Sequence, residues 1–246
     1  MPVPRCNVVE GAVACWALTF ETDTAGAILK LDHIAFVAQS LEQAQAYALQ
    51  RFGVSLPAGG KHPLMGTHNL VTRIAPGVFL EFIAIDPEAA PPNRARWFAL
   101  DRLMREGTLE EAPRLFGWVA SVPDLGRNVS ESLQHELLEV TRGDLRWHFF
   151  HRRDGEAELD GCWPALIDWA GGQSPVDTMQ DVGLRLTRFQ LAHPEMASIR
   201  ERLHRLGWEA AGAENRSVEL TDAERPGLTL VLNTPKGRVQ IEGGGL

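Results

Sequence analysis

A histidine and a carboxylate stand inside two largely apolar stretches of this chain. The run LDHIAFVA at 31–38 contains His33, and the run VFLEFIAI at 78–85 contains Glu81. Burying an imidazole and a carboxylate costs several kcal/mol unless each group is paired. Two interpretations follow: the side chains coordinate a metal ion, or they form a buried hydrogen-bonded pair that lines a pocket. Both interpretations place a pocket beside these two runs.

Between the two runs lies a glycine-rich segment, GGKHPLMGTHN at 59–69, which gathers several polar side chains: His62, Thr67, His68 and Asn69. Glycines allow backbone amides to approach a ligand closely, and a histidine can act as an acid or base near neutral pH. We therefore expect His62 to act in catalysis and Thr67 and Asn69 to bind substrate. Strand alternation turns His68 away from these two. The alternative is a tight glycine turn whose polar side chains satisfy the loop backbone.

Composition narrows the classes of partner. The chain has 246 residues, enough for one large domain or two small ones, and a formal net charge of −8, which disfavours nucleic acid and anionic membranes. No apolar run approaches the roughly 20 residues of a membrane helix, and the N-terminus lacks the pattern of a signal peptide. Cys6, Cys15 and Cys162 are widely spaced without a CxxC pair, which favours a reducing compartment. We expect a cytoplasmic protein that binds a small molecule. A homodimer is one possible oligomeric state.

Periodicity predicts a strand, a helix and further strands over about 29–86. The strand at 31–38 is followed by Ser40 and Gln43, which are typical of a helix start, and Gly53 marks the helix end. LVTRIA at 70–75 and VFLEFIAI then read as strands, with room for one more short strand near the glycine segment.

The same order of elements returns twice. Over about 183–242, a strand at 186–192 precedes a helix that ends at Gly207, and three strands follow. A weaker copy over about 114–170 has a strand at 115–122, then a predicted helix, then the strands LRWHFFHRR and PALIDWA. The apolar positions of that helix are Val129, Leu133 and Leu137. One βαβββ unit cannot cover its own sheet, so the repetition predicts an α+β fold of paired modules.

The remaining segments read as connections. Residues 1–28 form an extension, either an ordered strand or short helix or a disordered leader. The stretch 86–113 reads as a linker with a short helix at about 96–105, and 171–182 as a second linker. One compound domain over 29–242 is expected.

The strings LDHIAFV, GGKHPLMGTHN, VFLEFIAI and the later LIDW resemble the glyoxalase-like domain family of the vicinal oxygen chelate superfamily, most strongly over 31–85. The resemblance implies curved mixed sheets of βαβββ modules around a cavity that holds a divalent metal (Zn, Ni, Fe or Mn). It places the metal ligands on the first and last strands of each module. His33 and Glu81 occupy those positions in the first module.

The other modules depart from this pattern. Gly117 or Trp118 stands at the first-strand position of the middle module, and Arg188 and Val231 stand at the two positions of the last module. A metal would draw its further ligands from other side chains: His148, His151, Asp168 or a loop histidine. We expect His148 and Asp168 to bind substrate, although His148 also suits a strand surface and Asp168 also suits the start of a turn.

The function implied by the resemblance is a small-molecule enzyme of glyoxalase or dioxygenase type acting on an oxygenated organic substrate. Its cavity would be lined by His33, His62, Thr67, Asn69 and Glu81, with His62 and Glu81 as catalytic groups. The alternative is a metal-free protein of the same fold that binds or sequesters a small molecule. The sequence has no G-x-S-x-G nucleophile elbow and no phosphate-binding G-x-x-x-x-G-K-[ST] loop.

Overall fold

The computed structural model describes residues 28–172, 174–208, 212 and 215–245. Almost all of the predicted extension 1–28 lies outside this part. The first βαβββ unit consists of β1 (Lys30–Val37), α1 (Leu41–Phe52), β2 (Ala58–His62), β3 (Thr67–Ala75) and β4 (Val78–Ile85). The second consists of β5 (Arg114–Ser121), α3 (Leu125–Asn128), β6 (His135–Arg142), β7 (Leu145–Arg152) and β8 (Ala165–Asp168). The third consists of β9 (Arg185–His193), α4 (Met196–Arg205), β10 (Val218–Asp222), β11 (Gly227–Thr234) and β12 (Gly237–Gly243). A short helix, α2 (Leu100–Arg105), lies between the first two units.

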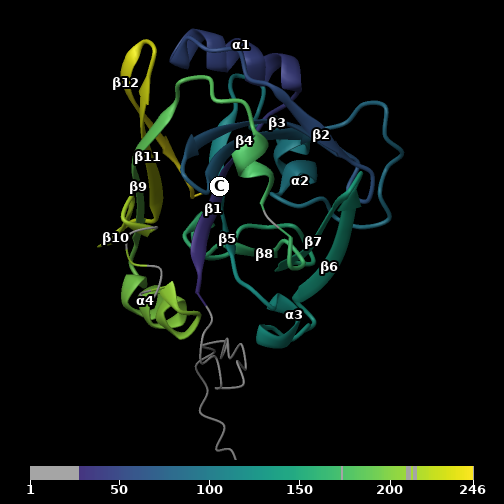
Figure 1. Cartoon of the computed structure of the whole chain (residues 1–246), viewed down its shortest axis with the longest axis vertical. Coiled ribbons are helices and arrows are strands. Elements are labelled where there is room, and N and C mark those ends of the chain that lie inside the picture. Colours follow the sequence, from purple (N-terminus) through teal and green to yellow (C-terminus); the bar gives the residue numbers. More distant parts are fainter. Residues whose placement is uncertain (1–27, 173, 209–211, 213–214, 246) are drawn as a thin grey trace, which may run out of the picture.

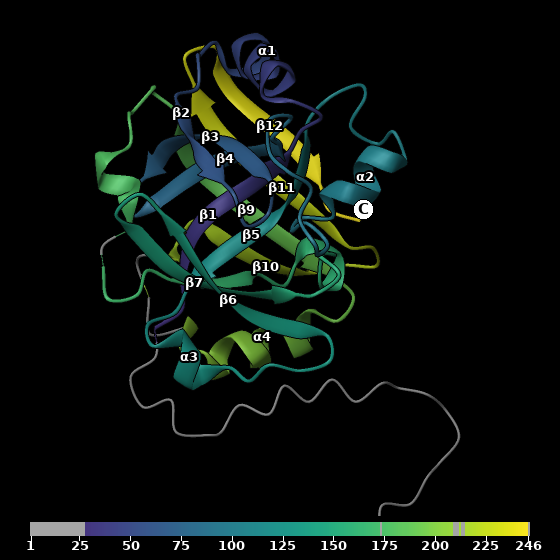
Figure 2. The ribbon, with the colours of Figure 1, turned by 90° about the vertical axis from the view of Figure 1, so that its right-hand side faces the viewer.

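The first two units share one strand arrangement. In each, the first strand pairs in parallel with the last, β1 with β4 and β5 with β8. Antiparallel pairing of β1 with β5 joins the units into a sheet of order β2-β3-β4-β1-β5-β8-β7-β6. The two ends of this sheet, β2 and β6, also contact each other, so the sheet bends round on itself (Figures 1 and 2). The expected α+β fold of βαβββ modules in a curved mixed sheet is confirmed.

The third unit repeats the order of elements but not the strand pairing. Its first strand, β9, lies between β10, to which it is parallel, and β11, to which it is antiparallel. The outer strand β12 meets β5 at a single residue pair, Gly243 with Leu115. The unit stands to one side of the other two (Figure 1). Its buried apolar side chains belong to the same core as side chains of the first two units.

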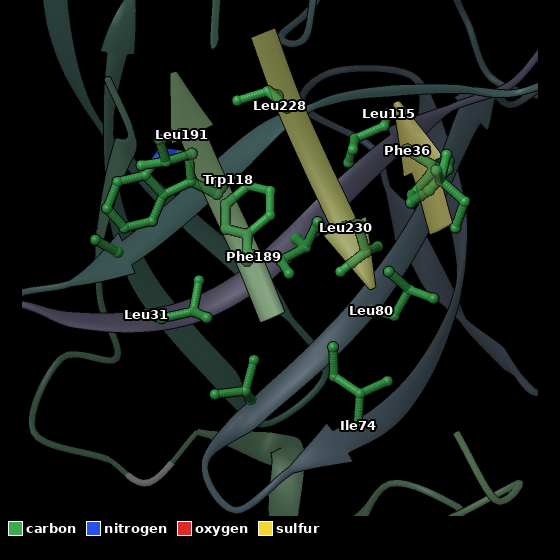
Figure 3. Packing of buried hydrophobic residues seen from close by; sticks show 14 of the residues in the cluster. Leu31, Phe36, Ile74, Leu80, Leu115, Trp118, Phe189, Leu191, Leu228 and Leu230 are labelled. Atoms are coloured by element: carbon green, nitrogen blue, oxygen red, sulfur yellow. The ribbon is translucent and has the colours of Figure 1, made fainter. Parts of the chain in front are cut away.

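Two apolar cores use opposite faces of the same strands. On the outer face of the curved sheet, side chains from β1, β4 and β5 pack against the third unit (Figure 3): Leu31, Phe36, Leu80, Leu115 and Trp118 lie against Phe189, Leu191, Leu228 and Leu230. On the inner face a second core contains Ala35, Val37, Ile83, Phe149 and Ile167. Because side chains of a strand alternate between its faces, β1 contributes to both cores.

Helix α1 begins and ends where the sequence predicts. The hydroxyl of Ser40 accepts a hydrogen bond of 3.2 Å from the backbone N–H of Gln43. The side-chain oxygen of Gln43 accepts one of 3.0 Å from the backbone N–H of Gln39, so the reciprocal bond reaches one residue beyond the cap. Gly53 ends the helix with φ 77°, a conformation that glycine adopts without strain.

The helix predicted around Val129, Leu133 and Leu137 is wrong. Helix α3 ends at Asn128, Leu133 is 98% exposed, and β6 begins at His135. The buried side chains of β6, such as Leu138 and Val140, recur at every second residue, which suits a strand paired with β7. Within the described residues, no helix combines the length and the apolar character needed to cross a membrane.

Candidate functional site

A partly open cavity lies against the inner face of the first two units. Its walls are largely aromatic, with rings from Phe79, Trp97, Phe98, Trp147, Phe149 and Trp169. The polar side chains that line it are His33, His62, Asn69, Glu81 and Arg142. An apolar cavity with a few convergent polar groups is the usual form of a small-molecule site.

His33 and Glu81 meet inside this cavity. They lie on the adjacent parallel strands β1 and β4, where Glu81 is in register with Ala35, two residues after His33. This offset puts both side chains on the inner face, with His33 Nε2 and Glu81 Oε2 3.5 Å apart. Each residue is only 5% exposed, and the His33 ring stacks on Phe79 with centroids 4.4 Å apart. The pocket expected beside the two apolar runs is present.

A second carboxylate stands behind His33. Asp32 Oδ1 lies 2.7 Å from His33 Nδ1, and Asp32 Oδ2 accepts a hydrogen bond of 2.9 Å from the indole N–H of Trp169. Because a carboxylate is an acceptor, one ring proton of His33 is assigned to Nδ1. Nε2 faces Glu81 Oε2, and a proton shared between these two atoms would join them. Trp169, Asp32, His33 and Glu81 thus form one continuous polar chain across the two modules.

Asn69 fixes the other oxygen of Glu81. Its amide group donates a hydrogen bond of 2.6 Å to Glu81 Oε1, and its own oxygen accepts one of 2.8 Å from the backbone N–H of Gly60. A Cβ at Gly59 would overlap the Asn69 oxygen, so glycine is required there by packing. The glycine-rich segment is a β-hairpin of β2 and β3 and not a loop, and its polar side chains are held by strand pairing.

His62 is buried, and both of its ring nitrogens have hydrogen-bond partners. Arg142 Nη1, which can only donate, lies 3.3 Å from His62 Nε2, so Nε2 is the acceptor and Nδ1 donates to Thr67 Oγ1 at 3.1 Å. Burial, reinforced by the nearby charge of Arg142, lowers the pKa of His62 to about 3. His62 is thus a buried neutral imidazole with both ring nitrogens in hydrogen bonds, and its catalytic role stays a prediction. His68 projects to the opposite side of β3, away from Thr67 and Asn69, as alternation predicts.

His148 and Asp168 lie outside the cavity. Both line a separate hollow at the ends of β7 and β8, with His148 Nδ1 and Asp168 Oδ2 3.9 Å apart. The Asp168 carboxylate accepts from the backbone N–H groups of Leu125 and Ala170, which is the turn role weighed for it above. The inner face of β7 is taken by Trp147 and Phe149. The structure thus places His148 and Asp168 in a different hollow from His33, and their contact with a substrate stays a prediction.

Several residues of the site were not expected from the sequence, among them Asp32, Trp97 and Arg142. Asp32 directly precedes His33 in an apolar run, and a second acid inside such a run is a signal that could have indicated it. Trp97 comes from the stretch expected to be a linker. Arg142 ends β6 beside a Gly-Asp turn and looks like an ordinary strand-end arginine, so only the closure of β6 on β2 brings it into the cavity.

The donor set does not fit the metal that the resemblance implies. His33 is oriented by a carboxylate at its other ring nitrogen, as metal-binding histidines are, and Glu81 is close enough to share an ion. Catalytic zinc sites usually hold three protein ligands, however. The second module lines the cavity with Arg142 and apolar side chains, and no group of three or more His, Cys, Asp or Glu side chains suited to a metal exists among the described residues.

Comparisons with known proteins place the chain in a family. The model of the family described as "Glyoxalase-like domain" matches residues 31–207, more than half of the chain. The match spans the first two units and continues through α4 of the third. No curated protein matches the chain.

Solved structures give weaker likenesses. A hypothetical protein from Staphylococcus aureus is 12% identical with a TM-score of 0.46, covering 89% of this chain and 87% of its own. Methylmalonyl-CoA epimerase from Mycobacterium tuberculosis is 13% identical with a TM-score of 0.36, covering 58% and 88%. A mutant 4-hydroxymandelate synthase from Streptomyces coelicolor is 12% identical with a TM-score of 0.38, covering 88% and 63%. Similarity at this level says nothing of the substrate of this chain. The family match and the paired βαβββ modules agree, and the chain belongs to the glyoxalase-like domain family.

Proposed function

We propose that this protein is an enzyme that transfers a proton on a small oxygenated organic molecule bound in the cavity. Glu81 is the base, and His33, backed by Asp32, takes the proton over from it. The observation that carries the proposal is the buried polar chain of Trp169, Asp32, His33 and Glu81, whose last member opens into an aromatic cavity. Membership of the family supports a small-molecule ligand.

The reaction class follows from the groups present. Glu81 removes a proton from a carbon next to a carbonyl, and the electron pair of that C–H bond moves into the carbonyl to form an enolate. The proton passes from Glu81 to His33 Nε2, and the Asp32 carboxylate stabilises the imidazolium that results. The separation of 3.5 Å between His33 and Glu81 suits a contact that tightens when substrate binds. Return of the proton to carbon completes an isomerisation or an exchange.

A second candidate is a binding protein of the same fold that performs no reaction. The aromatic walls favour it, because six rings suit tight enclosure of a planar molecule whether or not it reacts. The two candidates differ in what they require of Glu81: the enzyme needs a base, whereas the binding protein needs only a hydrogen-bonded wall.

Solvent exchange separates the two. The protein would be incubated in D2O with a panel of 2-oxo acids, 2-hydroxy ketones and small thioesters, and loss of the C–H signal next to each carbonyl followed by proton NMR. We expect exchange with at least one compound class, a fall of about 10²-fold or more in Glu81→Gln, and no change in Glu139→Gln, whose carboxylate is exposed on β6. Binding without exchange in the wild-type protein would instead identify a binding protein.

A further inference from the structure

Arg142 is a cation in the cavity without an acidic partner. Its guanidinium lines the cavity with His33 and Glu81, and its recorded contacts are a hydrogen bond to His62 and the face of Trp147, whose centroid lies 5.8 Å away. No carboxylate among the described residues forms an ion pair with it. Other arginines of the second module do have such partners, including Arg146 with Glu139 and Arg153 with Glu136.

This arrangement is costly in the free protein. Burial lowers the pKa of Arg142, against a raising effect of the Glu81 charge, but a guanidinium stays protonated in proteins. A half-buried guanidinium held by a neutral imidazole and an aromatic face keeps most of its donors without charged acceptors. Planar guanidinium groups bind carboxylates through two parallel hydrogen bonds. An anionic ligand would therefore supply what this site lacks.

A second donor in the cavity wall is also without an acceptor. Trp97 is 4% exposed and lines the cavity, and its buried indole N–H has no partner among the described residues. The Trp97 ring meets the His62 ring edge-on with centroids 5.3 Å apart, and His62 Nε2 accepts from Arg142. An indole N–H without an acceptor and a guanidinium without a carboxylate, both beside one imidazole, favour a ligand with several acceptor oxygens.

We propose that Arg142 binds the carboxylate of a small planar organic monoanion, whose flat apolar part lies among the aromatic walls and whose reactive atom faces Glu81. This inference rests on the proposed function for the role of Glu81, but not for the role of Arg142. A monoanion is favoured over a phosphate dianion because the cavity offers one cation and already contains one carboxylate, and the chain as a whole has a net charge of −8.

The test compares matched pairs of probes on the full chain by isothermal titration calorimetry. The probes are benzoate, 4-hydroxybenzoate and phenylpyruvate, each beside its neutral amide. In Arg142→Met the affinity for the carboxylates should fall by about 10- to 100-fold, the loss expected for hydrogen bonds to a charged group, whereas affinity for the amides should not change. Arg142→Lys should restore part of the affinity, and Arg146→Met, on the exposed side of β7, is the matched control.

Three results would overturn the proposal: no carboxylate binds the wild-type protein at millimolar concentration, the amides bind as well as the acids, or Arg142→Met binds the acids unchanged. Thermal melting of each variant shows whether it has folded, and Arg142→Lys decides the matter if Arg142→Met has not. Glu81→Gln should abolish exchange and keep carboxylate binding. If the wild-type protein binds carboxylates but catalyses no exchange, only the proposed function is rejected. If exchange proceeds at the same rate in Arg142→Met as in the wild-type protein, only this inference is rejected.

Discussion

The side chain of Arg142 lies directly over the backbone of Gly60, where β6 closes against β2. A Cβ at position 60 would stand 2.7 Å from Arg142 Cδ and 2.8 Å from Nη1. The absence of a side chain at one edge of the sheet therefore allows the arginine from the other edge to enter the cavity. Glycine suits position 60 because the Arg142 side chain occupies the space that a Cβ would need, and not because the backbone there requires glycine.

Replacing Gly60 by alanine should displace the flexible end of the Arg142 side chain and lower the free energy of unfolding by at most about 1 kcal/mol, the low end of the usual cost of overpacking. Urea unfolding would measure it. The cost should shrink when Arg142 is also replaced by alanine, because the clash is then gone. Gly227→Ala is the control, since a Cβ there meets its nearest atom at 3.9 Å. An equal cost in both Arg142 backgrounds would show that the contact is not the cause.

Trp169→Phe should reduce proton exchange about 10-fold while leaving ligand binding nearly unchanged. The phenyl ring preserves the aromatic wall of the cavity, but the indole N–H that donates to Asp32 is lost. Because Asp32 is only 2% exposed, its carboxylate then lacks a partner and no longer holds His33 in place. NMR exchange and calorimetry would measure the two effects separately. Trp147→Phe alters the same cavity without touching Asp32, so comparable exchange losses in both variants would count against the positioning role of Trp169.

Elemental analysis should find zinc, nickel, iron and manganese well below one ion per chain, even after incubation with each ion and dialysis. Two protein donors in a cavity that also contains a guanidinium hold a divalent cation weakly. His33→Ala and Glu81→Ala should give the same low values. One equivalent of metal in the wild-type protein, lost in both variants, would restore the metal-assisted mechanism.

The free energy of unfolding should decrease on acidification partly through His151. Burial, with the charge of Arg94, lowers the pKa of His151 to about 4, whereas a histidine in the unfolded chain titrates near about 6.5. As the pH falls, His151 is therefore protonated in the unfolded state before the folded state. The contribution of His151 to the free energy of unfolding is fully present above about pH 6.5 and is lost as the pH falls to about 4. His151→Gln should remove up to about 1.4 kcal/mol per pH unit from the slope in that window. The same change at the exposed His204 should leave the slope as it is.

Cys162 should resist thiol reagents in the folded protein. It is fully buried, its thiol donates towards the backbone oxygens of Ala192 and Gly227, and burial raises its pKa to about 11. In a Cys6→Ser, Cys15→Ser variant, which leaves it as the sole thiol, labelling at pH 8 should proceed only as fast as the protein unfolds. Rapid labelling without denaturant would show that the thiol is accessible.

Much of the first module could be predicted from local sequence. Ser40, Gln43 and Gly53 define α1 because caps act within a few residues, and a histidine or carboxylate inside an apolar strand has to find a buried partner. The pairing of His33 with Glu81 followed from that rule together with the family resemblance.

What local sequence could not predict depended on contacts distant in sequence. Val129, Leu133 and Leu137 have helical spacing, yet pairing with β7 makes the chain from His135 onwards a strand. His148 and Asp168 are of suitable chemical types but face outwards, and the face of a strand is set by register and not by composition. Arg142 enters the site only because β2 and β6 meet, which no local pattern records.

The alternation along β1 has a consequence for how this protein can change. Ile34 and Phe36 point to the core under the third unit, whereas His33, Ala35 and Val37 point to the core and cavity inside the curved sheet. Alternate residues of one strand therefore serve two purposes: one set packs against the third unit, and the other set shapes the cavity. Selection for a new ligand can replace the cavity-facing residues while the outward-facing residues continue to hold the modules together. The ligand specificity of this protein can therefore change without loss of its fold.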